Sequence, residues 1–506
     1  MKHLIKITAQ MLALLLTIGV FPIGQAAAET ASAPAQALPA SYDGRDYGYV
    51  TSIRDQGQFE TCWTFGTLAS IEAYMVKHGI CNASTGAPAD LDLDLAESHL
   101  AWFSYTQAYD ALGLLAGDAT VPSENYLSQS STNAMISYTL MRGAGPAAES
   151  EKALKYRNKR KGGLSEKYAF DYNAASVTDV TWIPATDRDA VKRAIMDYGA
   201  GSIAYHHDFS CMDLYAPDCT GGYYCGDYSD PNHLVCIIGW DDNFPKENFE
   251  ADYRPEHDGA WLIKNSWGPD LALDGYFYLS YEESSANAGS VVFYKVEALR
   301  PDRSCYQYDG TSNCISFQAM ADQGQLANVF TALETGGIQS VALATKDQNT
   351  SYTLCIYKNP SDEADPASGT LLHTQDGLLP YAGYHNIPLN SMPLLREGDR
   401  FAVVFTLSTP EPGEDGAYLH IPYDASAENI KEPDMEHPVS WIHADHGSTS
   451  FYREAGGEWT DCPDKGDFRI KAYVSDPYKA VSVQLNQIWS LSTAVCSRLL
   501  HCLLGR

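Results

Sequence analysis

The sequence predicts an α+β protein in which a region of mixed helices and strands is followed by an all-β sandwich. Before residue 298, apolar residues recur first at helical spacing and later in short β-rich runs. After residue 305, short β-rich runs alternate with clusters of Gly, Pro, Asp and Asn, which is typical of a sandwich. The length of 506 residues also exceeds what one compact core usually holds. We therefore expect at least two domains.

The chain divides into five segments on these patterns. A polar stretch containing Pro301 separates the two folded regions, and such stretches suit a domain boundary. The predicted segments are a signal peptide (1–28), a linker rich in Ala, Thr, Ser and Pro (29–37), a first domain (38–298), a second domain (305–475) and a C-terminal tail whose apolar spacing fits one face of a helix (476–506).

The N-terminus has the layout of an export signal. Lys2 and Lys6 precede an apolar run at 11–23, and three alanines at 26–28 offer a cleavage site before Glu29. The apolar run is short for a membrane span, so cleavage is favoured over anchoring. We expect an exported protein that is secreted or held at the cell surface.

The spacing of apolar residues predicts the positions of helices and strands. Helices are expected at 61–77, with Thr61 as N-cap, and at 187–198. Strands are expected at 234–240, 260–264, 276–281, 340–344, 352–357, 400–407, 417–421 and 468–474.

Charge and cysteine usage exclude several function classes. The net charge is −30, from 34 basic and 64 acidic residues, so a nucleic-acid partner is excluded by phosphate repulsion. The twelve cysteines include no C-x-x-C pair, which argues against a zinc ribbon or a dithiol redox site. Asp90, Asp92 and Asp94 alternate along one stretch, where an acidic solvent face is favoured over a calcium site. We expect no metal and no cofactor.

Cys62 lies where a thiol nucleophile would be placed. It opens the predicted helix, and the partial positive charge of a helix N-terminus favours a thiolate. Gln56, six residues earlier and next to Gly57, can direct an amide N–H at a developing oxyanion. Taken alone, a cysteine on an apolar helix is more often buried or disulfide-bonded than catalytic.

Two downstream motifs supply the other groups. His233 opens the apolar run that ends in Gly239 and Trp240, and a strand would hold its ring rigidly as a base. Asn265 lies in the run Lys264-Asn265-Ser266-Trp267-Gly268, where its amide can accept from the second ring nitrogen of the histidine. Taken singly, His233 and Asn265 each fit an ordinary structural role. Trp63 and Trp267 are predicted walls of the site.

The three motifs in this order resemble the papain family of cysteine peptidases. Leu38-Pro39 with Asp43-Gly44-Arg45-Asp46 is similar to the start of that catalytic domain, and 95–100 to the helix after the nucleophile helix. The resemblance implies a two-lobed fold, with a helical lobe and a β-barrel-like lobe, and protein or peptide substrates. It implies Gln56 in the oxyanion hole, Cys62 as nucleophile, His233 as general base and acid, and Asn265 as the orienting residue. Hydrolysis would pass through an acyl-enzyme thioester from a resting Cys⁻/His⁺ pair.

Several positions depart from the family pattern. Phe59 stands where the family usually has a disulfide-bonded cysteine, and Glu60 puts a carboxylate near the nucleophile. The glycine pair that admits the substrate backbone has no clear counterpart; residues 130–133 stand roughly in its place. The segment 29–37 is too short for the usual inhibitory pro-segment. These departures bear on peptide binding more than on the chemistry.

The second region resembles the lectin-like β-sandwich that follows papain-like enzymes in exported microbial proteins. The resemblance rests on the runs at 450–461 and 468–473. It implies possible contact with a cell surface or glycan. Trp441, Trp459 and Tyr452 can either stack on sugar rings or pack within the sandwich, and both interpretations stay open.

Three functions are compatible with these residues. The leading prediction is an exported cysteine endopeptidase. The alternatives are a surface adhesion or binding protein with an inactive papain-like domain, and a transpeptidase that passes its acyl group to an amine.

Overall fold

A computed structural model describes residues 37–108, 110, 112–122, 126–156, 163–212, 219–321, 323–410, 412–413, 416–431 and 437–476. The predicted signal peptide, nearly all of the linker and the C-terminal tail after Asp476 lie outside these ranges. Within the described ranges, no helix combines the length and apolar character needed to cross a membrane.

Helices are confined to the first part of the described chain. The longest, α2, begins at Cys62 and has thirteen buried residues, so it is a core helix rather than a surface one. The helices are α2 (Cys62–Lys77), α3 (Glu97–Phe103), α4 (Asn133–Met141), α5 (Arg188–Tyr198), α6 (Ala272–Gly275) and α7 (Ser284–Asn287), with 3₁₀ turns η1 (Gly44–Tyr47), η2 (Tyr126–Ser128), η3 (Glu166–Tyr168), η4 (Lys246–Asn248) and η5 (Pro463–Lys465).

One large sheet runs through most of the described chain. It holds thirteen strands, eleven of which follow one another in a single path. In spatial order these are β12 (Arg303–Tyr306), β27 (Ile470–Ser475), β15 (Gly336–Thr345), β18 (Ala382–Pro388), β5 (Ser176–Pro184), β11 (Ser290–Glu297), β6 (Gly201–Tyr205), β8 (His233–Asp241), β9 (Ala260–Lys264), β10 (Tyr276–Ser280) and β7 (Gly222–Tyr223), with β1 (Ser41–Asp43) beside β8 and β19 (Leu394–Leu395) beside β15.

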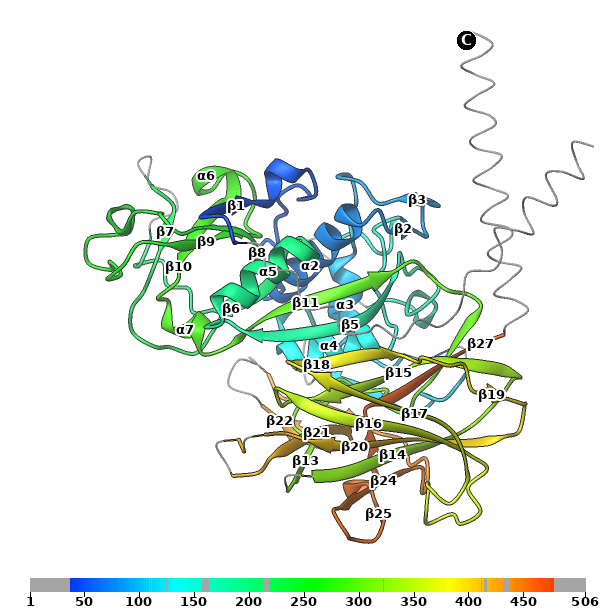
Figure 1. The fold of residues 1–506 in the computed structure, drawn as a ribbon. Helices are drawn as coiled ribbons and strands as arrows, with labels where there is room; N and C mark the ends of the chain where they lie inside the picture. The colour runs from blue at the N-terminus through cyan, green and yellow to red at the C-terminus, as the bar shows by residue number, and fades with distance from the viewer. Residues whose placement is uncertain are drawn as a thin grey trace, which may run out of the picture. The chain divides into compact units, whose positions relative to one another are not determined.

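The pairing of β18 with β5 joins the two halves of this sheet. The strands are antiparallel, with Tyr384 opposite Val180 and Ala382 opposite Trp182. Tyr384 is fully buried and belongs to the same apolar cluster as Cys62 and Trp63. Figure 1 shows β5 between β11 and β18 at this junction. The core of the N-terminal region therefore continues into the C-terminal strands.

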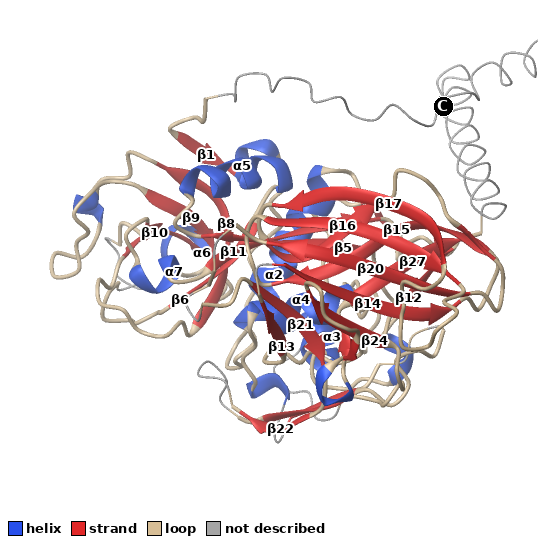
Figure 2. Cartoon of the chain, turned by 60° about the horizontal axis from the view of Figure 1, so that its bottom comes forward, coloured by secondary structure: helices blue, strands red, loops and turns tan. Residues whose placement is uncertain are grey.

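A second sheet faces the C-terminal part of the large one. Apolar residues from both sheets, such as Ile338 of β15 and Phe405 of β20, form one buried cluster, as expected for a sandwich. Figure 2 shows that this C-terminal part of the chain consists mainly of strands. The second sheet, in spatial order, holds β17 (Thr370–Leu379), β16 (Thr350–Lys358), β20 (Arg400–Ser408), β14 (Gln323–Thr331), β24 (Ser450–Glu454) and β25 (Thr460–Asp461).

Three small sheets complete the fold. One of them links the two regions, because β4 precedes α4 in the chain yet pairs with a C-terminal strand. They are β22 (Ala427–Ile430) with β23 (Val439–Ile442) and β4 (Ala119–Pro122); β13 (Phe317–Met320) with β21 (Leu419–Asp424) and β26 (Asp467–Phe468); and β2 (Cys81–Asn82) with β3 (Ala87–Pro88).

The α+β class and the C-terminal β-rich region are confirmed. The predicted helices correspond to α2 and α5, and the predicted strands correspond to β8, β9, β10, β15, β16, β20 and β21, with 468–474 spanning β26 and β27. The sheet that crosses from one region to the other was not predicted. Apolar alternation marks strands but does not choose their partners, which are far apart in the sequence.

Candidate active site

Cys62 is the first residue of α2 and lies against β8. Thr61 is the N-cap residue by position but makes no capping bond with its side chain, which instead contacts the hydroxyl of Tyr156 at 2.7 Å. Gly66, one turn further on, allows the close packing: a Cβ there would lie 2.5 Å from a methyl of Leu234. A larger residue would push the helix away from the strand that carries His233.

His233 and Asn265 meet because their strands are antiparallel neighbours. His233 begins β8 and Asn265 directly follows β9, and the register pairs Cys236 with Lys264. The ring Nε2 lies 2.9 Å from Oδ1 of Asn265, and both residues are about 5% exposed. The amide oxygen can only accept, so Nε2 carries the proton and Nδ1 is left to act as a base.

Trp267 covers the histidine. Its ring stacks on that of His233, with centroids 4.4 Å apart and planes inclined by 20°. The stacking fixes the imidazole plane and limits access of water to its hydrogen bond with Asn265. Trp267 therefore lies over the histidine, while Trp63 lines the cavity beside Cys62.

Gln56 is held beside this group by a loop. Its backbone N–H donates to the carbonyl of Ser266 (2.9 Å), and its Oε1 accepts from the Ser266 hydroxyl (2.7 Å). Its Nε2 donates one hydrogen to the carbonyl of Phe59 at 2.9 Å. A primary amide has two N–H groups, so one stays available for a substrate oxygen.

Burial controls the charges of the two central groups. It raises the pKa of the Cys62 thiol to about 11, although backbone hydrogen bonding from Leu234 and Trp63 opposes the shift. The nearby Glu60 carboxylate raises the thiol pKa further. Burial lowers the pKa of His233 to about 4, against the opposing effect of its bond to Asn265. These directions favour a neutral thiol and a neutral imidazole, in contrast to the charged pair that the family resemblance implies.

Cys62 and His233 line one cavity of about 320 Å³. Residues 130–133, which stand roughly where the family's glycine pair is expected, also line this cavity. Trp63 is anchored there, since its indole N–H donates to the carbonyl of Gln129 at 2.9 Å. The cavity is lined by Cys62, Trp63, Ser130, Ser131, Thr132, Asn133, Ala204, Asp230, Pro231, Asn232, His233, Leu234 and Gly289. The cavity is large enough to admit peptide side chains.

Two residues near the site carried no signal in the sequence. The hydroxyl of Tyr156 donates to the carbonyl of Gln56 at 2.8 Å and also contacts Thr61, so it braces the loop before Cys62. His207 is buried, with its ring 4.8 Å from Trp267 and 6.0 Å from His233 between centroids. Each lies far from Cys62 in the chain and in no local motif, so only the fold reveals it.

Cysteines beyond Cys62 have separate roles. Cys211 and Cys225 form a disulfide in the stretch before β8. Phe59 replaces the family's usual cysteine and packs edge-on against Tyr156, with ring centroids 6.4 Å apart. An aromatic contact therefore braces the chain before the nucleophile, in place of a covalent one.

The candidate sugar-stacking aromatics are not equivalent. Trp441 is completely buried, and its indole N–H donates to the Ser312 hydroxyl at 3.3 Å, so it packs in the core. Tyr452 and Trp459 are partly exposed, and the guanidinium of Arg453 lies 4.5 Å from the ring centroid of Trp459. Only these two offer a face that a ligand can approach.

Comparison with known families identifies both regions. Residues 38–87 and 133–296 match the sequence model of the papain family of cysteine proteases. Residues 305–474 match the lectin like domain family. The fold of the first region thus belongs to the papain-like class. The chain combines a papain family cysteine protease domain with a C-terminal lectin-like domain.

Two solved structures share this combination. The clostridial cysteine protease Cwp84 after propeptide cleavage is 26% identical, with a TM-score of 0.68, over 86% of this chain and 99% of that one. The cysteine protease and lectin-like domains of Cwp84, a surface layer associated protein of Clostridium difficile, are 25% identical, with a TM-score of 0.66, over 87% and 89%.

Curated relatives match the first region. Procathepsin L of Felis catus is 28% identical over 252 residues, which cover 49% of this chain and 62% of the relative. Oryzain gamma chain of Oryza sativa subsp. japonica is 26% identical over 278 residues, covering 52% and 61%. The chain thus spans about three fifths of the length of these relatives.

Proposed function

We propose that this chain is an active cysteine endopeptidase that hydrolyses peptide bonds through a thioester on Cys62. The observation that carries the proposal is the shared cavity of Cys62 and His233, with the His233 ring fixed by Asn265 at 2.9 Å. An inactive binding protein would have no need for a thiol and an oriented imidazole in one cavity.

The first step is attack on the substrate carbonyl. Sγ of Cys62 forms a bond to the carbonyl carbon while Nδ1 of His233 takes the thiol proton. Because burial favours the neutral forms, proton transfer accompanies the attack rather than preceding it. The Asn265 oxygen stabilises the imidazolium that forms, since it accepts from Nε2–H.

The developing oxyanion is stabilised by two donors. The second N–H of Gln56 and the backbone N–H of Cys62 are the groups proposed for this role, because the Gln56 side chain is oriented by Phe59 and Ser266. The tetrahedral intermediate collapses as His233 gives its proton to the leaving amine. Water then attacks the thioester with His233 again as base, and free Cys62 returns.

We propose that the two matched regions work as one folded body. The pairing of β18 with β5 and the buried Tyr384 support this, because separation would expose a sheet edge and apolar surface. Residues 38–298 and 305–475 expressed alone are expected to melt at lower temperature than the whole chain or to aggregate. Equal melting temperatures would contradict the proposal.

We propose that the protein is exported. The basis is the N-terminal signal pattern, and the surface layer association of Cwp84 is consistent with it. N-terminal sequencing of protein recovered outside the cells should begin at Glu29. Protein that stays inside the cells with Met1 intact would contradict export.

Covalent labelling tests the enzymatic proposal. The purified protein is treated with a thiol-directed epoxide, and the adduct is located by mass spectrometry. We expect one adduct on Cys62 and parallel loss of cleavage of an unfolded protein substrate. Absence of both labelling and cleavage would favour the binding protein instead. Adding an amine acceptor addresses the third alternative, because a ligated product in place of the free acid identifies a transpeptidase.

A further inference from the structure

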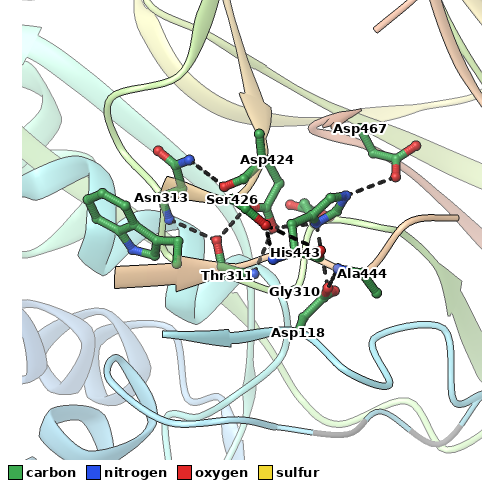
Figure 3. A network of polar contacts seen from close by, with 12 residues as sticks. Asp118, Gly310, Thr311, Asn313, Asp424, Ser426, His443, Ala444 and Asp467 are labelled. Atoms are coloured by element: carbon green, nitrogen blue, oxygen red, sulfur yellow. Dashed lines mark hydrogen bonds and ion pairs between the residues drawn. The ribbon is translucent and has the colours of Figure 1, made fainter. Parts of the chain in front are cut away.

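Three strand ends bring together two carboxylates and an imidazole away from the cleft. Asp118 directly precedes β4 and His443 directly follows β23, and these strands are antiparallel partners, with Ala119 opposite Ile442. Asp424 ends β21, opposite Asp467 of β26. The side chains of Asp118 and Asp424 are fully buried, and that of His443 is 2% exposed. Figure 3 shows the group, which we call the His443 cluster: Asp118, Asp424 and His443.

The spacing within the His443 cluster is that of ligands around a shared ion. Nδ1 of His443 lies 3.5 Å from Oδ1 of Asp118 and 3.6 Å from Oδ2 of Asp424. All three donor atoms lie within 4.8 Å of one another. Ligands about 2.1 Å from a tetrahedral zinc ion are separated by about 3.4 Å.

Two atoms of the cluster have no hydrogen-bond partner although they are buried. They are Nδ1 of His443 and Oδ2 of Asp118. Oδ2 lies against Gly310, where a Cβ would approach it to 2.2 Å, so a side chain at this position would displace the Asp118 carboxylate. Among the described residues, no Lys or Arg nitrogen lies within 4 Å of the Asp118 carboxylate. Buried polar atoms without partners are costly, and the one that faces both carboxylates is Nδ1 of His443, which lies near Oδ1 of Asp118 and Oδ2 of Asp424.

The surrounding groups hold the three side chains in a ligating orientation. Nε2 of His443 donates to Oδ2 of Asp467 at 3.1 Å, so Nδ1 is the ring nitrogen that faces Asp118 and Asp424. The backbone N–H of Ala444 donates to Asp118 at 2.6 Å, and that of Thr311 donates to Asp424 at 2.7 Å. A histidine that donates its second nitrogen to a carboxylate is the usual arrangement in metal sites.

We propose that Asp118, Asp424 and His443 bind a divalent transition-metal ion, of which Zn²⁺ is the best fit. One imidazole nitrogen with carboxylate oxygens suits zinc, whereas calcium and magnesium prefer oxygen ligands alone. A water completes the fourth position. Asp467, held by His446 at 2.8 Å, orients the imidazole.

Nη2 of Arg469, 3.7 Å from Oδ1 of Asp424, already places one positive charge here, and a proton on His443 competes with a metal ion to place the next. The carboxylates of Asp424, Asp467 and Asp118 raise the pKa of His443 to about 11 against the effect of burial. A proton on Nδ1 would draw a carboxylate to about 2.7–2.9 Å, the length of a charge-assisted hydrogen bond. The two longer and nearly equal separations favour an ion between the three groups.

The ion would join the peptidase region to the lectin-like strands. Asp118 lies in 88–132, between the two stretches that match the papain family, whereas Asp424 and His443 belong to the lectin-like match. The chain after β4 reaches the cleft wall, where the carbonyls of Leu127 and Gln129 accept from Glu60 and Trp63. Metal binding thereby ties the wall beside Cys62 to the sandwich.

The test measures Zn²⁺ binding directly and needs no enzymatic activity. The full chain carrying Cys62→Ala, which removes a competing thiol ligand, is stripped with a chelator and titrated with Zn²⁺ by calorimetry. Asp118→Asn keeps the shape of the side chain and its acceptor for Ala444, and should weaken binding at least about 100-fold. His420→Gln is the matched control: this histidine pairs with Asp347 at 2.7 Å outside the cluster, and affinity should not change.

Anomalous scattering at the zinc edge provides a second readout that no folding defect can mimic. The expected result on the stripped and reloaded chain is one zinc atom bonded to His443 Nδ1 and to both carboxylates. Failure of the chain to bind Zn²⁺, unchanged affinity in Asp118→Asn, or a zinc atom only elsewhere would each overturn the proposal. So would NMR evidence that His443 stays doubly protonated with Zn²⁺ in excess.

Discussion

His233 and His443 show how neighbouring charges decide what a buried histidine can do. Each lies at the end of a β-strand, and each has Nε2 held by an oxygen, at 2.9 Å from Asn265 and 3.1 Å from Asp467. Burial lowers the pKa of His233 to about 4, because its neighbours, a neutral amide and an indole, offer no negative charge to oppose the shift. Carboxylates surround His443, and its pKa rises to about 11. The first environment suits a proton acceptor, and the second suits bound positive charge.

Of the changes that test this comparison, His233→Ala is expected to have the largest effect, which is on kcat. Without the base, the thiol of Cys62 keeps its proton, because burial holds its pKa near 11. We expect kcat to fall by about 10⁴-fold, on the scale of other catalytic groups of this kind. Steady-state cleavage of an unfolded protein measures this, with circular dichroism to verify the fold. A fall of less than tenfold would show that another base serves the thiol.

The next effect is that of Gln56→Ala, which removes the proposed oxyanion donor. Loss of one such donor typically costs about 10²- to 10³-fold in kcat, or about 2.7–4 kcal/mol. The KM should change little, because the bond forms mainly in the transition state. Measuring kcat and KM for this variant shows whether Gln56 acts in the transition state or in substrate binding. A rise in KM at constant kcat would place Gln56 in substrate binding instead.

At His443, the comparison is tested by adding Zn²⁺ and measuring the stability of the folded chain. Zn²⁺ at 100 times its dissociation constant should stabilise the folded chain by about 2.7 kcal/mol. Thermal unfolding of the stripped protein with and without Zn²⁺ measures the change. The Asp118→Asn variant should respond much less. Equal stabilisation of both proteins would mean that the ion binds at a different place.

The smallest effect is that of Asn265→Ala. Its hydrogen bond raises the pKa of His233, so its loss should move the acid limb of kcat/KM below about pH 4. Loss of one hydrogen bond should also reduce kcat about tenfold. A pH profile from pH 3 to 8 records both. An acid limb that stays in place would show that Asn265 does not set the basicity of His233.

The sequence predicted many of the individual helices and strands but few of the contacts between elements that are distant in the chain. The helix that begins at Cys62 and the strands that carry His233 and precede Asn265 each have a local apolar pattern, so their positions could be predicted. The pairing of β18 with β5 could not, because no local pattern selects a partner strand 200 residues away. The burial of Trp441 was likewise undecided by sequence.

The same contrast applies to the two polar sites. Gln56, Cys62, His233 and Asn265 lie in short motifs that resemble a known family, and these residues were proposed from sequence alone. Asp118, Asp424 and His443 lie in no shared motif, and the sequence predicted no metal. Their proximity depends on the register of β4 with β23, which only the folded chain reveals. Tyr156, which braces Gln56 and Thr61, was missed for the same reason.

The most direct test of the central claim compares Cys62→Ala with Cys81→Ala. Cys81 is a free, partly exposed cysteine in the same region, away from the residues that line the cleft. Cleavage of an unfolded protein is measured for both variants and for the parent chain. We predict that Cys62→Ala abolishes turnover, with a loss of at least about 10⁴-fold, while Cys81→Ala retains the parent rate. Turnover that survives in Cys62→Ala would contradict the assignment of Cys62 as nucleophile.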